Sequence, residues 1–314
     1  MRAYVTGGHG FVGTWLAAHL SDSGDEVFAP RMAEVDVTDA TAVAESMSSI
    51  SPDAVYHLAG LAHVGGSWDA PDRYFRVNAL GTLSVLEAAR RCATPPRVLV
   101  VSSAEVYGAV RAEQLPVDED APMLPRSPYA SSEAAAELVA VQAYLGRGLP
   151  VIRARPFNHV GPGQDPGFVV PAVARRIVEA SRDGRTTLPV GNLTARRDLT
   201  DVRDVVRAYR LLVELGSPGQ VYNVCSGADV SIEEILRRLL DLAGARLRPE
   251  PDPDLVRPVD VPVLLGDPGR LRAATGWAPE IPLDATLQAV LEDETRSGSG
   301  VASFSGATPR PGRH

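Results

Sequence analysis

The chain has 314 residues, room for one large α/β domain or two modest ones, and its 45% apolar content can bury a core without disulfides. Its 31 basic residues are all arginine, and it contains no lysine, which excludes Schiff-base chemistry, a phosphate-loop lysine and any lysine-assisted catalytic pair. The net charge of −8, the scattered arginines and the 5% aromatic content argue against a nucleic-acid surface.

Cysteine usage and hydropathy point to a soluble, reduced protein. Cys92 and Cys225 are too few for a disulfide framework or a metal cluster, so no metal is expected. The first residues enter a strand pattern directly, and no apolar run approaches the roughly 18 residues of a membrane span. A cytoplasmic protein that contacts neither membranes nor nucleic acid is therefore predicted.

Short β-branched runs alternate with helical periodicity through the first half of the chain. The predicted strands are 3–6, 26–29, 54–58, 97–102 and 150–155. This rhythm is typical of an α/β fold in which helices cover both faces of a doubly wound parallel sheet. The third and fourth strands are nearly continuous apolar runs, as expected when both faces of a strand are buried.

Glycine and proline accumulate after about residue 161, and the strand–helix rhythm loosens. Helices of this half are predicted at 169–182, 202–215, 232–243 and 283–293. The predicted organisation is a first domain of residues 1–160 to which 199–225 returns, a smaller C-terminal lobe of 161–198 and 226–296, and a tail of 297–314. The tail is rich in serine, glycine and proline, which predicts disorder.

The first strand leads into a glycine-rich turn, Thr6-Gly7-Gly8-His9-Gly10-Phe11-Val12-Gly13, and then into a helix. Glycines 7, 10 and 13 allow a tight turn, close approach of the backbone to a pyrophosphate and close packing of the helix, whose N-terminus faces the anion. This context predicts a dinucleotide that contacts Gly7, Gly10, Phe11 and Val12, and the spacing matches the short-chain dehydrogenase type.

The residue after the second strand bears on which dinucleotide binds. NAD-specific proteins hold the ribose 2′-hydroxyl with a carboxylate at this point, whereas this chain has Arg31. A guanidinium suits a 2′-phosphate, which favours NADP(H) over NAD(H). Glu34 and Asp36 are alternative acids for the ribose and keep NAD open. Asp36 and Val37 are suited to contacting adenine, although capping of the next helix explains this acidic cluster equally well.

Two motifs follow the fourth strand: Ser102-Ser103-Ala104-Glu105-Val106-Tyr107 and, further on, Ser127-Pro128-Tyr129-Ala130-Ser131-Ser132-Glu133. With them the chain resembles the extended short-chain dehydrogenase/reductase family of nucleotide-sugar epimerases, dehydratases and reductases. The resemblance implies a Rossmann domain with a smaller α/β substrate lobe. It also implies that Ser103 and Tyr129 flank a sugar carbonyl beside the nicotinamide, while Glu133 stands where the family's Tyr-x-x-x-Lys helix has lysine.

The resemblance covers residues 1 to about 295 and is nearest to the GDP-mannose 4,6-dehydratase and GDP-4-keto-6-deoxymannose reductase branch. It is carried further by the segments 56–60, 155–164, 197–204 and 221–227. It implies NADP, with NAD as the alternative, bound also by Asp36, Val37, Leu58, Ala59, Gly60, Asn78, Ser102, Tyr129 and Pro156. It implies that a nucleoside-diphosphate sugar is held by Ser103, Asn158, Val170, Leu188, Arg197 and Arg257. A homodimer formed through the helices at about 69–90 and 129–145 is expected.

The residues present discriminate among the reactions of this family. Its dehydratases use a Thr/Ser-Asp/Ser-Glu triplet, whereas this chain retains the base candidate Glu105 but has Ala104 in place of the polar partner. A carboxylate at Glu133 would oppose ionisation of Tyr129, because a unit charge about 4 Å away is worth on the order of 4 kcal/mol at an effective dielectric near 20. Oxidation, with which an epimerase starts, needs a tyrosinate, whereas reduction starts from neutral Tyr129.

The sequence therefore predicts an NADPH-dependent 4-ketoreductase of a nucleoside-diphosphate 4-keto-6-deoxyhexose in deoxysugar biosynthesis. In this hypothesis Glu133 accepts hydrogen bonds from the nicotinamide ribose. One alternative is a nucleotide-sugar epimerase or 4,6-dehydratase. A second is a non-catalytic nucleotide-sugar-binding homologue, since the family lysine is replaced, although the retained Ser103 and Tyr129 weigh against it.

Overall fold

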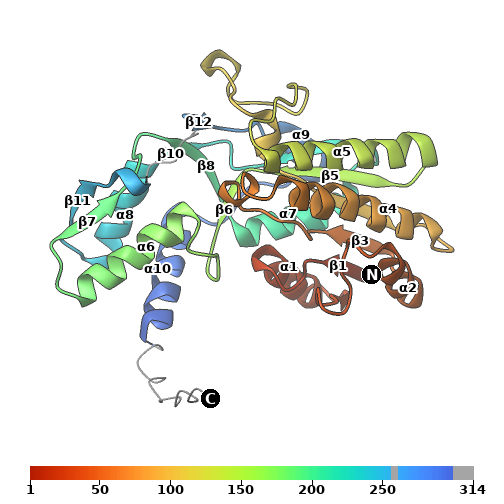
Figure 1. The fold of residues 1–314 in the computed structure, drawn as a ribbon, viewed down its shortest axis with the longest axis horizontal. Helices are drawn as coiled ribbons and strands as arrows, with labels where there is room; N and C mark the ends of the chain where they lie inside the picture. The colour runs from red at the N-terminus through yellow and green to blue at the C-terminus, as the bar shows by residue number, and fades with distance from the viewer. Residues whose placement is uncertain (256–260, 300–314) are drawn as a thin grey trace, which may run out of the picture.

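The computed structural model describes residues 1–255 and 261–299 of the chain. A large sheet flanked by helices is joined to a smaller lobe that contains its own strands and, in its described part, three helices (Figure 1). The described residues include no helix long and apolar enough to cross a lipid bilayer.

The large sheet has six strands in the order β2-β1-β3-β4-β5-β9, all paired in parallel. The strands are β1 (Arg2–Thr6), β2 (Glu26–Phe28), β3 (Ala54–His57), β4 (Arg97–Val101), β5 (Val151–Pro156) and β9 (Val221–Val224). The chain goes from β1 to β2 on one side and returns to β3 on the other, so the strand order reverses next to β1. Ligands of open parallel sheets bind at the carboxyl ends of the strands beside such a reversal.

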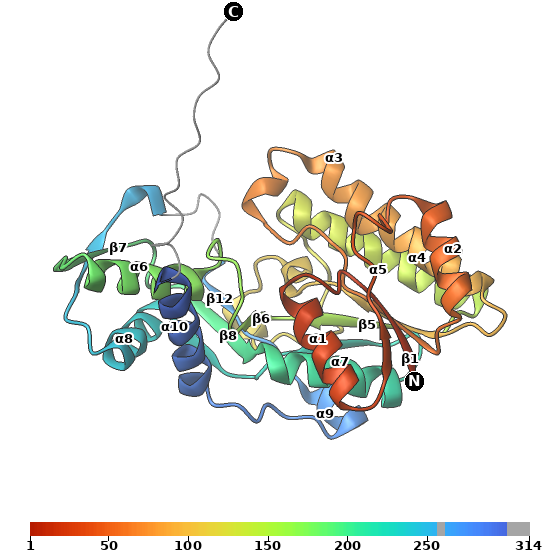
Figure 2. The same cartoon turned by 90° about the horizontal axis from the view of Figure 1, so that it is seen from below.

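Helices cover both faces of this sheet (Figure 2). One face carries α1 (Phe11–Asp22), α7 (Val202–Leu215) and α9 (Gly269–Thr275), and the other carries α2 (Ala40–Ile50), α4 (Gly81–Arg91) and α5 (Pro128–Arg147). Alternate strand residues point to opposite faces, as in β1, where Val5 joins the first core and Tyr4 the second. Short segments precede α4 and follow β4: η1 (Gly65–Ser67), α3 (Pro71–Tyr74), η2 (Phe75–Leu80), η3 (Ala104–Tyr107) and η4 (Ala112–Gln114).

The smaller lobe is organised around β8 (Arg196–Asp201). This strand pairs with β6 (Asn158–Val160), β10 (Asp229–Ser231) and β12 (Val263–Leu264), while β7 (Thr187–Val190) pairs with β11 (Arg248–Pro251), which η5 (Pro253–Leu255) follows. The helices α6 (Val169–Arg182), α8 (Ile232–Ala243) and α10 (Leu283–Ser299) enclose a separate apolar core. Their sequences alternate apolar and charged positions at helical spacing, and the apolar side chains face this core.

Most of the predicted elements are present, and the fold differs from the prediction at two places. The helices predicted at 169–182, 202–215 and 232–243 match α6, α7 and α8 at both ends. The last helix continues to Ser299, so the tail predicted from residue 297 begins too early, and its remaining residues, 300–314, lie outside the described part of the chain.

The second difference concerns the segment that contains α9 and Trp277. The prediction places it in the smaller lobe, but Leu271 and Trp277 are buried against α7 and β9 in the core of the large sheet. The Trp277 indole N–H donates to the backbone oxygen of Asp204 on α7, at 3.0 Å. The apolar side chains of this segment thus complete the cover of the sheet, which its weak sequence periodicity does not reveal.

Candidate active site

The glycine-rich turn after β1 lies at the carboxyl end of the sheet and leaves no room for side chains. Gly7 has φ +70°, and a Cβ on it would come within 2.8 Å of the Ala59 nitrogen. A Cβ on Gly13 would lie 2.1 Å from the Gly7 oxygen, so helix and strand pack as closely as backbones allow. Gly10 is the N-cap of α1 and has no side chain to cap its first turn. The open helix N-terminus and the bare backbone fit a dinucleotide pyrophosphate.

The two apolar residues after Gly10 face away from that open helix end. The Phe11 ring stacks on the ring of His159 in β6, with centroids 6.1 Å apart, and Val12 packs against the first core of the large sheet. The backbone N–H groups of Phe11 and Val12 are therefore what remains for the predicted cofactor contacts, which stay a prediction. Phe11 also links the glycine turn to the smaller lobe.

The end of β2 presents a cationic side chain where an adenosine ribose would lie. Arg31 is exposed, and its backbone N–H donates to the Glu34 carboxylate at 2.8 Å, so Glu34 closes the turn that carries the guanidinium. Sequence reasoning misses His9 of the glycine turn, whose Nε2 lies 3.0 Å from the Ala29 oxygen. An imidazole and a guanidinium thus flank the end of β2, where they suit a 2′-phosphate.

The acidic cluster that follows is occupied with local structure. The Asp36 carboxylate accepts hydrogen bonds from the backbone and hydroxyl of Thr38, both at 2.8 Å, and Asp39 caps α2. Val37 is buried, and a Cβ on Gly81 of α4 would come within 2.9 Å of its side chain. The interpretation of this cluster as a helix cap therefore holds for Asp39. Adenine contacts by Asp36 and Val37 stay predictions.

A chain of hydrogen bonds holds the segment after β3 in place. His57 is buried between the Thr6 hydroxyl at 2.7 Å and the Thr82 hydroxyl at 2.9 Å, and burial lowers its pKa to about 4. Thr6 in turn accepts from the backbone N–H of Ala59, at 3.2 Å. The predicted cofactor segment Leu58, Ala59 and Gly60 thus lies beside the glycine turn, fixed by neutral groups.

Asn78 joins this segment to α5. It lies in η2, a π-helical turn of the kind often found at functional sites. Its Oδ1 accepts from the Leu61 N–H at 2.8 Å, and its Nδ2 donates to the Glu133 carboxyl at 2.7 Å and to the Ser132 hydroxyl at 3.0 Å. The predicted cofactor segment after β3 and the helix that carries Tyr129 and Glu133 are therefore physically connected.

Ser103 and Tyr129 meet at the carboxyl ends of β4 and β5. Ser103 caps η3, and Tyr129 lies in the first turn of α5, which Ser127 caps through the Ala130 N–H. The Ser103 hydroxyl lies close enough to Tyr129 to act on its pKa, which it lowers. Burial, and next the charge of Glu133, hold the pKa of Tyr129 well above its usual value, so its proton is retained. The sequence-predicted pair is brought together in its proton-donating form.

Glu133 is buried one helical turn beyond Tyr129. Burial, and next the nearby charge of Glu137, raise its pKa to about 8, against which the Asn78 hydrogen bond is the smaller effect. At neutral pH the acid form therefore prevails, which revises the expectation of a fixed negative charge at this position. The expected opposition to a tyrosinate operates chiefly through the dry surroundings of Tyr129.

The neighbouring arginines are committed to another carboxylate. Glu137 is fully buried and receives two hydrogen bonds from Arg155, at 2.7 and 2.9 Å, and one from Arg153 at 3.3 Å. Arg155 also donates to the Tyr107 hydroxyl, which donates to Asn223 on β9. Both arginines of β5 are therefore paired with Glu137. Within the described residues, neither forms an ion pair with Glu133.

The remaining predicted residues beside the cofactor site are close at hand. Glu105 lies near enough to Tyr129 for its charge to raise the tyrosine pKa further. The hydroxyl of Ser102 is buried and has no hydrogen-bond partner among the described residues, and Pro156 ends β5 in a buried position. An orphaned hydroxyl at this edge of the sheet fits a bound polar group.

The predicted substrate residues divide into three groups. Asn158 carries a buried Oδ1 without a partner in the part of the chain that the structure describes, which fits a ligand. One guanidinium nitrogen of Arg197 donates to the Val261 oxygen at 2.7 Å, while Arg257 lies outside the described residues. Val170 and Leu188 have 2% and 0% of their surface exposed and belong to the core of the lobe, so the prediction that their side chains hold the nucleotide sugar is corrected.

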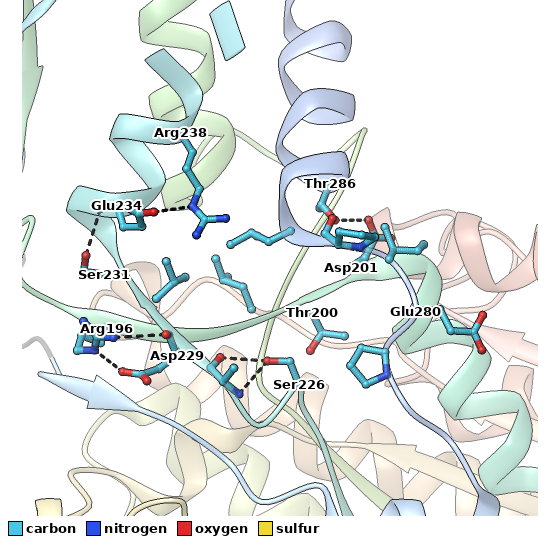
Figure 3. A pocket seen from close by; sticks show the side chains of 17 residues that line it. Arg196, Thr200, Asp201, Ser226, Asp229, Ser231, Glu234, Arg238, Glu280 and Thr286 are labelled. Atoms are coloured by element: carbon cyan, nitrogen blue, oxygen red, sulfur yellow. Dashed lines mark hydrogen bonds and ion pairs between the residues drawn. The ribbon is translucent and has the colours of Figure 1, made fainter. Parts of the chain in front are cut away.

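A cavity of about 760 Å³ lies in the smaller lobe between β8, β10, α8 and the segment before α10 (Figure 3). None of the predicted site residues that the structure describes lines it. Each of its charged side chains forms an ion pair, as in Glu234 with Arg238 at 2.8 Å, and Thr286 donates to Asp201 at 2.7 Å. Its lining therefore serves the cohesion of the lobe.

Similarity to known proteins identifies the family of this chain. The family model described as GDP-mannose 4,6 dehydratase matches residues 29–290. The chain belongs to the GDP-mannose 4,6-dehydratase family. Among its relatives, GDP-6-deoxy-D-mannose reductase of Pseudomonas aeruginosa is 38% identical over 294 residues, covering 93% of this chain and 96% of that protein. GDP-mannose 4,6 dehydratase 2 of Caenorhabditis elegans is 29% identical over 265 residues, covering 78% and 69%. The predicted family is confirmed.

Solved structures of other proteins share the fold. RMD from Pseudomonas aeruginosa, complexed with NADPH, superposes with a TM-score of 0.88 at 37% identity, covering 94% of this chain and 99% of that one. UDP-glucose 4-epimerase of Thermus thermophilus, in complex with NAD, has a TM-score of 0.83 at 29% identity and covers 94% and 99%. The predicted Rossmann-like α/β class is thereby confirmed.

Proposed function

We propose that this chain is an NADPH-dependent 4-ketoreductase that acts on a nucleoside-diphosphate 4-keto-6-deoxyhexose in deoxysugar biosynthesis. The observation that carries the proposal is that Ser103 lies beside the buried Tyr129, whose surroundings hold it in its protonated form. The likeness to a GDP-6-deoxy-D-mannose reductase over 93% of the chain supports the same activity. The cofactor site and the orphaned Asn158 oxygen supply the two ligand positions that such a reaction requires.

The residues divide the work of the reduction. Bound NADPH supplies the hydride. The Ser103 hydroxyl donates a hydrogen bond to the sugar 4-keto oxygen, and Tyr129 gives that oxygen its proton as negative charge develops there. The bare glycine turn and the open end of α1 hold the pyrophosphate, while Arg31 and His9 face the 2′-phosphate.

The other reactions of the family fit the site less well. Epimerisation at C4 and 4,6-dehydration both begin by oxidising an alcohol, for which Tyr129 must first lose a proton that its surroundings retain. Dehydration further needs a polar partner beside Glu105, where this chain has a buried Ala104. A purely binding role leaves the Ser103–Tyr129 pair without a use.

Two further features of the molecule belong to this proposal. We infer that the large sheet with α7, β9 and α9 binds the cofactor and that the lobe holds the nucleotide sugar through Asn158, Arg197 and Arg257. We infer also that the chain forms a homodimer, because η2, α4 and α5 present exposed leucines side by side. Dimerisation and a cytoplasmic location stay predictions.

The decisive experiment measures NADPH oxidation with a panel of 4-keto-6-deoxyhexoses carried on GDP, dTDP and UDP. We expect consumption of one NADPH per alcohol formed with at least one of them. Tyr129→Phe, which removes only the acidic proton, should lower the rate on the order of 10²- to 10⁴-fold. Silence across the panel contradicts the proposal, and product formation without net NADPH use supports epimerisation or dehydration instead.

A further inference from the structure

We propose that Glu133 acts as a neutral carboxylic acid that returns a proton to Tyr129 after each reduction. The proposal rests on the reduction described above and adds a step that completes its proton balance. Tyr129 is buried and gives up its proton to the substrate oxygen, so a second turnover requires a proton source close to the phenolate. The carboxyl groups of Glu105 and Glu133 both lie near Tyr129, and Glu133 is the buried one, on the same helix, without an ion-pair partner among the described residues.

The placement follows from the helix that carries both residues. Tyr129 and Glu133 are four positions apart on α5 and therefore lie on one face of the helix, one turn above the other. Both are buried, with 8% and 7% of their surface exposed. Asn78 donates to Glu133 Oε1 at 2.7 Å, which positions the carboxyl group and leaves its second oxygen to carry the proton.

The charges around Glu133 favour its acid form. Arg153 and Arg155 on β5 are bound to Glu137, and Glu133 forms no ion pair within the described part of the chain. The ionisable groups of the other elements packed against α5 do not neutralise it. Tyr74, Glu105 and Tyr107 are uncharged or negative, Arg76 reaches outward to Asp72, and Arg90 is bound to Glu87. Arg73 of α3 and Arg91 of α4 are exposed at the surface, and neither forms an ion pair with Glu133. A carboxyl group in this setting keeps its proton at neutral pH.

The step balances in protons and bonds. The Tyr129 O–H bond breaks as the new alcohol O–H forms, which leaves a phenolate. The Glu133 O–H bond then breaks and the phenol O–H bond forms again, leaving a carboxylate that takes a proton from solvent before the next turnover. A carboxyl group with a pKa of about 8 is a stronger acid than this tyrosine, so the transfer runs toward Tyr129.

The first test does not depend on turnover. Infrared difference spectra of the ligand-free protein against Glu133→Gln should contain the carbonyl band of a protonated carboxylic acid at neutral pH, and the band should titrate away near pH 8. Glu119→Gln is the matched control, because Glu119 is another buried carboxyl group whose pKa burial raises. It should leave the Glu133 component in place. Absence of that component at neutral pH overturns the proposal.

The second test separates proton return from positioning. In rapid-mixing experiments with Glu133→Gln, the first NADPH equivalent should be oxidised at close to the wild-type rate, because Tyr129 still holds its proton. Later turnovers should slow at least tenfold and gain a solvent isotope effect. Equal slowing of first and later turnovers assigns Glu133 a positioning role and overturns the proposal. If the wild-type protein turns over no member of the panel, the reductase assignment fails, whereas the infrared result still decides the state of Glu133.

Discussion

Position 133 concentrates what is unusual in this lysine-free chain. Elsewhere arginine provides every permanently basic side chain, and an arginine at 133 would have retained a charge, yet the chain has glutamate there. The structure supplies the reason that glutamate is tolerated in a buried place. Glu137 forms ion pairs with both nearby guanidinium groups, and Asn78 donates a hydrogen bond to Glu133. The Glu133 carboxyl group keeps its proton and so avoids the cost of burying a charge.

Replacing Glu133 with lysine should favour the reverse reaction. An ammonium group one turn from Tyr129 stabilises the phenolate, and each unit by which the tyrosine pKa falls gives about tenfold more of the basic form. We expect alcohol oxidation with NADP⁺ to accelerate by about tenfold or more, while ketone reduction changes less. Initial rates measured in both directions at one pH check this. Equal changes in the two directions contradict it, and Glu133→Gln, which brings no charge, serves as control.

Arg31 provides a second prediction at the scale of one residue. Its guanidinium is exposed at the end of β2, where we expect it to meet the 2′-phosphate that distinguishes NADPH from NADH. Arg31→Ala should weaken NADPH binding about tenfold, the equivalent of about 1.4 kcal/mol for a lost charged contact, and leave NADH binding unchanged. Titration of cofactor fluorescence gives both dissociation constants. An equal loss for the two cofactors would show that Arg31 supports the fold and not the phosphate.

At the scale of elements, the sequence predicts the helices and strands that are defined by contacts between residues close together in the chain. Helices such as α7, with regular apolar spacing, can be predicted to the residue. The contacts that define the site join distant segments: Asn78 from η2 touches Glu133 on α5, and His9 touches the end of β2. The prediction assigns Val170 and Leu188 to the ligand, but an apolar residue on an amphipathic element is more often core, and packing of the lobe requires both.

The segment η2 and the helices α4 and α5 pack together on one face of the sheet, where α4 and α5 lie side by side (Figure 2). Leu80, Leu138 and Leu145 have 56%, 60% and 75% of their surface exposed. Such a surface is typical of an interface between copies of a chain. The double substitution Leu80→Glu and Leu138→Glu should convert the expected dimer into monomers, as measured by light scattering during size-exclusion chromatography. Leu215→Glu, which alters an exposed leucine of α7 on the other face, should leave the mass unchanged.

At the scale of the whole molecule, one buried polar network ties together segments far apart in the sequence. Glu137 of α5, Arg155 of β5 and Tyr107 of η3 are linked to Asn223 of β9, which also bonds to Glu119. These buried groups satisfy one another's hydrogen-bonding capacity, because a buried polar group without a partner would destabilise the fold. The network fixes α5 relative to the sheet and thereby fixes the distance between its Tyr129 and the carboxyl ends of the strands.

The buried acid makes the stability of the whole molecule depend on pH. The pKa of Glu133 is about 8 in the folded protein and near 4.5 when the chain is unfolded, so between these values the folded state binds more protons and stability falls as pH rises. The loss amounts to a few kcal/mol, on the order of the pKa shift at about 1.4 kcal/mol per unit. Urea unfolding of Glu133→Gln should lack this component. A variant that loses stability over the same window as the wild type would contradict the assignment.

The junction of the two parts of the molecule contains its own optical probe. The Trp15 indole on α1 donates to the Pro162 oxygen at 3.1 Å, and the adjacent Gly163 N–H donates to Asp293 of α10 at 2.8 Å. The other two tryptophans lie elsewhere, Trp277 in the core and Trp68 at the surface. With both replaced by phenylalanine, the emission of Trp15 reports on this junction alone. Fluorescence then tests whether the smaller lobe changes its contact with α1 when a ligand binds, without an attached dye.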